Sequence, residues 1–258
     1  TCALPIFSPI RQTTSMKYFL LFAFSLMFFF ACEKDGVEQI NVIIPESIVV
    51  PEDMVYIPSG NFIMGHPDDP GTKRGEAIIQ EAFLIDRFEV TNEQFSFFNP
   101  SYTFHPKRAR FPVSMVTFEQ AENYCKSNGR RLPNETEWEK AARGTDGRKW
   151  PWKKYYERPN NGFSGFIPEA VDHREEWISP YGVYGMGHNV WEWTSSWYIS
   201  DKAFESDPNR YKVIRGGLTQ THTVIKFTPT FFRNKMEPAA FFNFIGFRCA
   251  CSVNCQEG

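Results

Sequence analysis

Residues 218–248 lie between an Arg-Gly-Gly motif at 215–217 and a Gly-Phe-Arg-Cys motif at 246–249, which frame them like an active-site segment. The segment contains no cysteine, and its only sulfur belongs to Met236. Because copper(I) prefers thiolate or thioether ligands, we expect no copper site here. His222 is the best candidate in the segment for a polar group that lines a pocket, and a partly exposed loop histidine is the alternative.

The five histidines of the chain give no other catalytic signal. No two of them have the helical or turn spacing of a metal triad, so nonhaem iron is unsupported. The sequence also lacks a nucleophile elbow, a phosphate loop and a cysteine–histidine pair in a diagnostic context. We therefore assign no catalytic residue.

Five motifs in a fixed order carry a resemblance to a known family. They are Val-Tyr-Ile-Pro-Ser-Gly-Asn-Phe-Ile-Met-Gly at 55–65, Arg-Arg-Leu-Pro-Asn-Glu-Thr-Glu-Trp-Glu-Lys-Ala-Ala-Arg-Gly at 130–144, Tyr-Gly-Val-Tyr-Gly-Met-Gly-His-Asn-Val-Trp-Glu-Trp-Thr at 181–194, Arg-Gly-Gly at 215–217 and Gly-Phe-Arg at 246–248. Over residues 52–250 the chain resembles the formylglycine-generating enzyme (sulfatase-modifying factor) family. The resemblance implies an α+β fold of the C-type-lectin kind, with low regular secondary structure and short helices around small antiparallel sheets. A fold does not by itself imply activity.

Catalytic members of that family carry two cysteines after the Arg-Gly-Gly motif, where they bind copper and activate oxygen to oxidise a substrate cysteine. Counted from Gly217, these positions fall near Thr221 and Lys226, and Leu218 replaces the serine that follows the motif. The sequence therefore predicts no formylglycine generation by the family mechanism. We expect Leu218, Thr221, His222 and Lys226 to line an altered pocket that binds rather than reacts.

The resemblance also implies structural calcium. In the family, the Asn and Glu of an Asn-x-Trp-Glu-Trp motif help to hold the ion, and Asn189 and Glu192 match them, with the Val190 carbonyl as a further donor. Oxygen ligands on a tight loop suit Ca²⁺, which tolerates irregular geometry. In this chain Gly185 replaces a polar residue of the motif and His188 replaces a glycine. The candidates for a second family site are Asn161, or its neighbour Asn160, and Asp172.

The chain has six cysteines, at positions 2, 32, 125, 249, 251 and 255. Cys2 precedes the expected start of the protein, and Cys32 belongs to the export signal described next. An exported protein meets an oxidising compartment, so the remaining four are expected to form disulfides. The family resemblance implies a bond between Cys125 and Cys249. Cys251 and Cys255 then either close a small loop or stay free.

An export signal is predicted before the folded domain. Lys17 precedes an apolar run at 18–31, which is too short for a comfortable membrane span but matches the hydrophobic region of a signal peptide. Ala31 followed by Cys32 resembles a bacterial lipoprotein processing site, with Phe29 in place of the usual leucine. We expect lipidated Cys32 to anchor an outer-membrane lipoprotein of the bacterial cell envelope. An ordinary secretory signal or a short anchor is the alternative.

These observations divide the chain into five expected parts. They are an upstream artefact at 1–15, a lipoprotein signal peptide at 16–31, a lipid-anchored tether at 32–51, the sulfatase-modifying-factor-like domain at 52–250 and a tail at 251–258. With 42% hydrophobic and 17% aromatic residues, the chain can build a packed core. Its formal net charge of -2 provides no basic surface, so we expect no nucleic-acid partner.

Local patterns predict the elements that position the motifs. Short helices should begin at the capping pairs Thr91 with Gln94, Thr117 with Gln120 and Asn134 with Glu137. Gly129 and Gly144 should close the second and third helices. Strand-like runs lie at 54–58, 61–64, 83–90, 211–215 and 244–250. Residues 145–185 follow neither period, so side chains or ions are expected to satisfy their backbone.

Two functions remain open from the sequence. The first is a membrane-anchored lipoprotein whose enzyme-like domain serves as a binding or assembly module, either as a structural subunit of the gliding or secretion type or as a ligand-display domain. Residues 218–248 would then be the recognition face for a protein or glycan partner. The second is a sulfatase-modifying-factor-type oxidoreductase that uses an unrecognised metal site.

Overall fold

The computed structural model describes residues 39–67, 75–152, 157–159, 168–199, 209–220 and 224–255. The chain divides into two compact units, Thr1–Asp35 and Gly36–Gly258, and all of the described residues belong to the second. Cys32 and the predicted signal peptide lie outside the described residues. No helix in the described ranges is long and apolar enough to cross a membrane.

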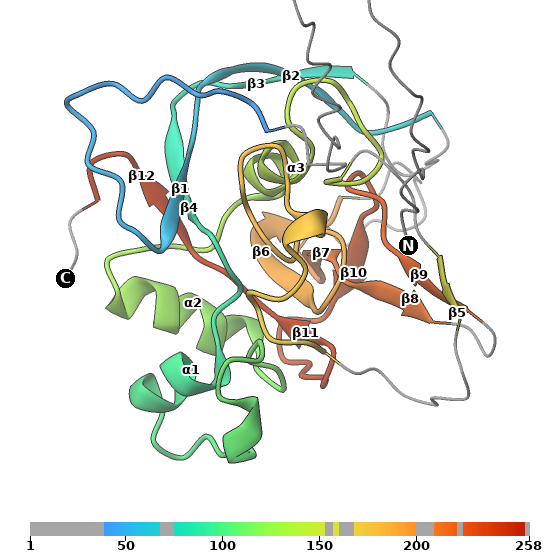
Figure 1. Cartoon of the computed structure of the whole chain (residues 1–258). Helices are drawn as coiled ribbons and strands as arrows, with labels where there is room; N and C mark the ends of the chain where they lie inside the picture. The colour runs from blue at the N-terminus through green and yellow to red at the C-terminus, as the bar shows by residue number, and fades with distance from the viewer. Residues whose placement is uncertain are drawn as a thin grey trace, which may run out of the picture. The chain divides into compact units, whose positions relative to one another are not determined.

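Four small sheets contain the strands that the structure describes (Figure 1). The first is antiparallel and has the order β1 (Met54–Ile57), β4 (Phe83–Asp86) and β12 (Ala250–Ser252). The second has the order β10 (Asn234–Met236), β7 (Lys212–Gly216), β6 (Trp191–Trp197) and β11 (Ile245–Gly246), of which only the last pair is parallel. The third pairs β2 (Gly60–Met64) with β3 (Gly75–Ile79). The fourth has the order β5 (Glu157–Pro159), β9 (Val224–Phe227) and β8 (Leu218–Gln220).

The helices begin where the capping pairs predicted. They are α1 (Asn92–Phe98), α2 (Phe118–Ser127) and α3 (Glu135–Arg143), with short 3-10 turns at η1 (Pro106–Arg108) and η2 (Glu175–Trp177). Each α-helix has a complete capping box, in which the N-cap side chain accepts a hydrogen bond from the third helical residue and that residue's side chain accepts one in return. Gly144, with a φ of 71°, follows α3 as predicted, and Asn128 caps α2 one residue before Gly129. The predicted α+β fold, with short helices around small and mostly antiparallel sheets, is confirmed.

Two predicted strands differ from the structure. The run 83–90 ends as a strand at Asp86, and farther along the run the backbone partner changes, because the N–H of Val90 donates to the Phe247 carbonyl and not to the chain before β1. The run 244–250 is split between β11, which pairs with β6, and β12, which pairs with β4. The residues between β11 and β12 therefore cross from one sheet to another, and Arg248 lies buried at this crossing.

Helix α3 connects the sheets. It contacts β2, β3, β6 and β7 and lies between them in Figure 1. Its inward face carries Trp138, Ala141 and Ala142, all fully buried as their spacing predicted. This position makes α3 the element through which charged side chains of distant segments can meet.

The packed domain extends beyond the predicted limits of 52–250. Ile40 and Val42 pack against the core, and the N–H of Ile40 donates to the Pro180 carbonyl at 2.8 Å. Residues 39–51 form no strand. At the other end, Cys251 is buried in β12 rather than lying in a tail.

Both disulfides close within this domain. The predicted bond between Cys125 and Cys249 is present and ties α2 to the chain just before β12. Cys251 and Cys255 also bond, so the small closed loop is the alternative observed.

Candidate functional site

The arginine of the Arg-Gly-Gly motif belongs to a buried ion-pair network. Arg215 is fully buried, and its Nη2 donates to Glu139 Oε2 at 2.5 Å and to the Thr230 carbonyl at 2.7 Å. The other oxygen of Glu139 pairs with Arg143 at 2.6 Å, and Arg143 donates in turn to the Gly65 carbonyl. The motif arginine therefore ties β7 to α3 and to two loops, which is a structural role.

The arginine of the Gly-Phe-Arg motif makes a second pair of the same kind. Arg248 is fully buried, and its Nε and Nη2 each donate to an oxygen of Glu192 at 2.7 Å. Glu192 Oε2 also accepts from Trp138 Nε1 at 2.8 Å, and Arg248 Nη2 donates to the Tyr184 carbonyl. Each of the two framing motifs thus contributes an arginine to a buried arginine–glutamate pair.

The first residues after the Arg-Gly-Gly arginine pack against tryptophan side chains. Gly217 has a φ of 73°, and a β-carbon there would lie 2.5 Å from the Trp191 ring, so glycine allows this close approach. Leu218 follows, is partly buried and packs against a cluster of Trp150, Trp152 and Trp177. Leu218 therefore adds an apolar contact at this position instead of a hydroxyl.

Of the other predicted pocket residues, the structure describes only Lys226. Lys226 lies on β9, in register with Thr219 on β8 and with Glu157 on β5. Thr221 and His222 lie outside the described residues. The structure thus brings Leu218 and Lys226 into one small sheet, and the predicted pocket stays a prediction.

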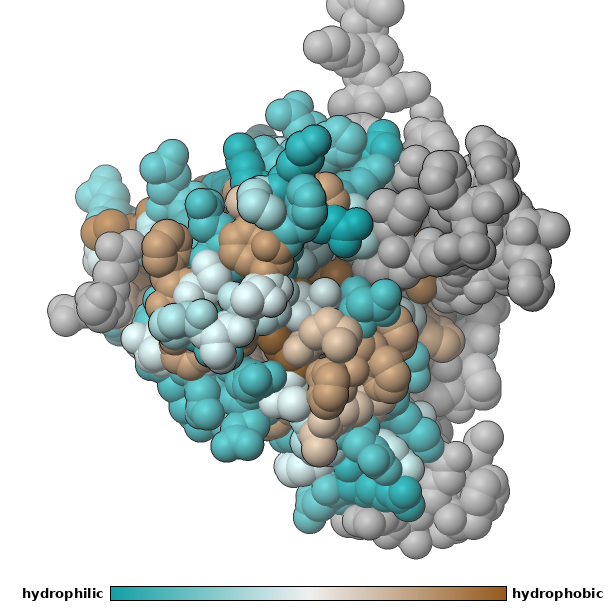
Figure 2. Space-filling model, turned by 90° about the horizontal axis from the view of Figure 1, so that it is seen from below, coloured by the Kyte–Doolittle hydropathy of each residue, from teal (hydrophilic) through white to brown (hydrophobic). Residues whose placement is uncertain are grey.

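Farther along the segment, large apolar side chains gather at the surface. With one residue from the loop before α2 they form what we call the aromatic patch: Phe232 (40% exposed), Phe241 (54%), Phe242 (42%) and Met115 (49%). Contacts link the patch residues. The Met115 N–H donates to the Phe242 carbonyl, and Phe242 stacks on Phe244. The Phe244 carbonyl accepts from the N–H of the buried Trp191, against which Phe232 lies. Figure 2 shows hydrophobic side chains gathered on the face seen from below. Exposed apolar side chains that lie together in this way form a candidate interaction surface.

Two of the predicted calcium ligands, Asn189 and Val190, lie on the loop that enters β6, and the third, Glu192, lies near the start of that strand. Asn189 has a φ of 67°, which asparagine tolerates, and its Oδ1 accepts from the Glu169 N–H at 3.0 Å. Val190 is fully buried, with its carbonyl facing Gly216. Glu192 is the residue that pairs with Arg248.

A buried acid beside this loop was missed from the sequence. Glu89 is 1% exposed, and neither of its carboxylate oxygens has a hydrogen-bond partner. In the described part of the chain, Arg248 is the cation paired with it, and Arg248 Nη2 lies 3.9 Å from Glu89 Oε2. Burial raises the pKa of Glu89 to about 7, and the Glu192 charge adds to the rise, while Arg248 and the neighbouring Asn189 amide, which lies outside hydrogen-bonding geometry, oppose it. The available signal was an acid inside the apolar run 83–90.

These groups fit a hard cation by their chemistry. Two carboxylates, the Asn189 amide and nearby backbone carbonyls provide only oxygen donors, which Ca²⁺ prefers. Within the described ranges no group of three histidine, cysteine, aspartate or glutamate side chains is placed to hold a metal. A cation here would therefore need amide and carbonyl oxygens as well as the carboxylates of Glu89 and Glu192.

Of the predicted second calcium site, the structure describes Asp172. Asp172 Oδ2 pairs with Arg110 Nη2 at 2.5 Å, and both side chains are partly exposed. Asn161 and Asn160 lie outside the described residues. The pair with Arg110 competes with any cation for Asp172.

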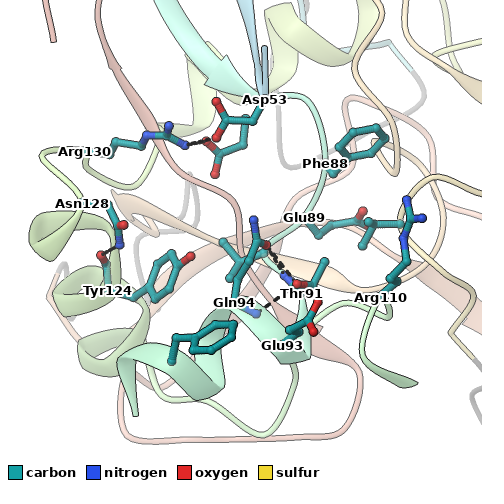
Figure 3. Close-up of a pocket in the computed structure, with 14 residues that line it drawn as sticks. Asp53, Phe88, Glu89, Thr91, Glu93, Gln94, Arg110, Tyr124, Asn128 and Arg130 are labelled. Atoms are coloured by element: carbon teal, nitrogen blue, oxygen red, sulfur yellow. Dashed lines mark hydrogen bonds and ion pairs between the residues drawn. The ribbon is translucent and has the colours of Figure 1, made fainter. Parts of the chain in front are cut away.

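Figure 3 shows a pocket that is lined by the end of β4 and the chain after it, by α1 and by α2. Its volume is about 710 Å³. Asp53 and Asp86 both pair with Arg130 in its wall, at 2.8 and 2.7 Å. Burial raises the pKa of Asp86 to about 6, although Arg130 opposes the rise. The pocket is lined by none of the residues predicted to bind ligand in the segment 218–248. The pocket is therefore distinct from that segment, although the buried acid Glu89 contributes to its lining.

Comparison with known proteins matches most of the chain to one family. The family model described as "Sulfatase-modifying factor enzyme 1-like domain" matches residues 43–253. The chain is 27% identical to the uncharacterized protein YfmG of Bacillus subtilis, in an alignment that covers 81% of this chain and 58% of that protein. It is 29% identical to "Inactive C-alpha-formylglycine-generating enzyme 2" of Bos taurus, over 63% of this chain and 75% of that protein. The chain thus spans little more than half of the Bacillus relative.

A solved structure supports the fold. Treponema denticola variable protein 1 superposes with a TM-score of 0.58 and 20% identity, over 77% of this chain and 94% of that one. At this identity the likeness concerns the fold alone.

Proposed function

The chain belongs to the sulfatase-modifying factor enzyme 1-like domain family, and from this premise we propose that its domain is a binding or assembly module of the bacterial cell envelope rather than a formylglycine-generating oxidase. The positions that would carry the oxidase chemistry hold Leu218, Thr221 and Lys226, which offer no sulfur ligand for copper(I). The arginines of the framing motifs both have buried glutamate partners. The retained motifs are therefore accounted for without a catalytic role.

The aromatic patch carries the proposed binding role. Phenylalanine side chains present a large apolar area with few rotatable bonds, so they gain more on burial in an interface than they lose in entropy. Met115 has a φ of 61°, which is uncommon for residues other than glycine. Because backbone strain of this kind tends to be kept at functional sites, the conformation of Met115 supports a functional role for the patch. Because the patch consists of phenylalanine and methionine rather than hydrogen-bonding groups, we favour a protein partner over a glycan.

The anchor and the cofactor complete the proposal. The sequence at 16–32 supports attachment to the outer membrane through lipidated Cys32. A structural calcium ion held by Asn189, the Val190 carbonyl and Glu192 would stabilise the loop that enters β6. That loop leads into the strand that carries Trp191, which supports Phe232 of the patch.

Changing the patch tests the binding role. Phe241→Ser with Phe242→Ser should lower recovery of a co-purifying envelope protein at least about tenfold, because truncating central apolar anchors removes several kcal/mol of binding energy. The melting temperature should change little, since both side chains are already half exposed in the free domain. The measurement is quantitative mass spectrometry of proteins crosslinked to the lipoprotein in intact cells.

Phe97→Ser is the matched control, because Phe97 is 81% exposed on α1 and lies outside the patch. The control should retain the same partner as the wild type. Equal partner recovery by the patch variant, the control and the wild type would contradict the proposed role.

A further inference from the structure

The surroundings of Glu89 contain one negative charge too many for a buried site. Among the described residues, Arg248 lies beside two buried carboxylates, and Glu192 takes its two short contacts at 2.7 Å. Glu89 is left with the 3.9 Å approach and with no hydrogen bond to either oxygen. An unpaired buried carboxylate is costly, so such a group calls for a cation or a proton.

Gly185 provides the space that the Glu89 carboxylate uses. A β-carbon at Gly185 would lie 2.3 Å from Glu89 Oε1 and 2.6 Å from its Oε2, so no larger residue fits while Glu89 is in place. Gly185 is also the position where the family motif has a polar residue and this chain has none. The carboxylate of Glu89 thus enters, from the chain after β4, the place that a side chain at residue 185 would occupy. In Figure 3 Glu89 lies on the side of the pocket away from Asp53 and Arg130, which form their own ion pairs.

We propose that Glu89 is a calcium ligand in this chain, with its carboxylate taking the position left by Gly185 and completing the site of Asn189, Val190 and Glu192. The inference rests on the proposed structural calcium and adds to it the ligand that the sequence lacks. A divalent cation beside Glu89 and Glu192 offsets the excess negative charge, and calcium accepts the irregular mixture of carboxylate, amide and carbonyl oxygens better than magnesium does.

The test measures calcium binding by the full-length lipoprotein in detergent, by titration calorimetry and by thermal unfolding with calcium or with a chelator. The wild type should melt at a higher temperature in calcium. Glu89→Gln, which keeps the shape and removes the charge, should weaken the calcium affinity at least about tenfold and abolish most of the melting shift. Glu93→Gln, on the exposed side of α1, is the matched control and should behave as the wild type.

The possible outcomes distinguish the role of Glu89 as a ligand from the existence of the calcium site itself. A wild-type shift that Glu89→Gln retains in full would overturn the role of Glu89 and leave the calcium site standing. No calcium binding by the wild type would overturn both. If Glu89→Gln does not fold, the double variant Glu89→Ala with Gly185→Asn provides the decisive measurement. It returns an oxygen ligand to residue 185 and should bind calcium within about tenfold of the wild type, whereas loss of binding by this folded variant would overturn the placement.

Discussion

Replacing Arg215 by methionine is expected to destabilise the domain by about 3–5 kcal/mol, because it leaves Glu139 buried without one of its two arginine partners. Methionine fills most of the volume, so the loss reflects the charge and the hydrogen bonds to Glu139 and Thr230 rather than a cavity. The free energy of unfolding from urea denaturation, with an unchanged m-value, measures the effect.

Arg210→Met is the matched control for this variant. Arg210 pairs with Glu237 at the surface, where both side chains are more than half exposed, and such pairs contribute about 0–1 kcal/mol. A loss at Arg215 no larger than the loss at Arg210 would show that the motif arginine is not the structural element described above. A functional reason for keeping it would then be needed.

Removing the disulfide between Cys125 and Cys249 should cost about 5 kcal/mol in the chain-entropy model, because the two residues are 124 apart in the sequence. The bond also connects α2 to the chain that passes from β11 to β12, so its loss frees the C-terminal strand of the first sheet. Cys125→Ala with Cys249→Ala, compared with the wild type by urea denaturation under non-reducing conditions, measures this.

The second disulfide provides an internal comparison. Cys251 and Cys255 are only 4 apart, so the same model gives about 2 kcal/mol for Cys251→Ala with Cys255→Ala. A smaller loss for the long loop than for the short one would contradict the entropic explanation and the assigned role of the Cys125 bond.

Elements that depend on neighbouring residues were predictable from the sequence. Thr91, Thr117 and Asn134 begin their helices because the cap and its acceptor are three residues apart, and no distant contact is needed. The break in the run 244–250 was not predictable, since it depends on which strand lies beside each half. One half pairs with β6 and the other with β4, and the buried position of Arg248 between them follows from Glu192.

The candidate site likewise contains residues that could be predicted from the sequence and residues that could not. Asn189 and Glu192 could be assigned from their motif, whereas Glu89 could not, because its burial depends on Gly185 and Arg248, both distant in the sequence. The patch residues of 218–248 fell within the predicted recognition face. Met115 did not, since its place beside Phe242 arises from a backbone hydrogen bond between distant segments.

An oxidation assay tests most directly whether the domain is an oxidase: the purified protein is incubated with copper(I), oxygen and a cysteine-containing sulfatase peptide. A catalytic member of the family, assayed in parallel, confirms that the peptide is a substrate. Because Leu218, Thr221 and Lys226 offer no thiolate for copper(I), we expect no bound copper at stoichiometric occupancy and no formylglycine in the peptide by mass spectrometry. Formylglycine formed with repeated turnover would contradict the proposed loss of oxidase activity.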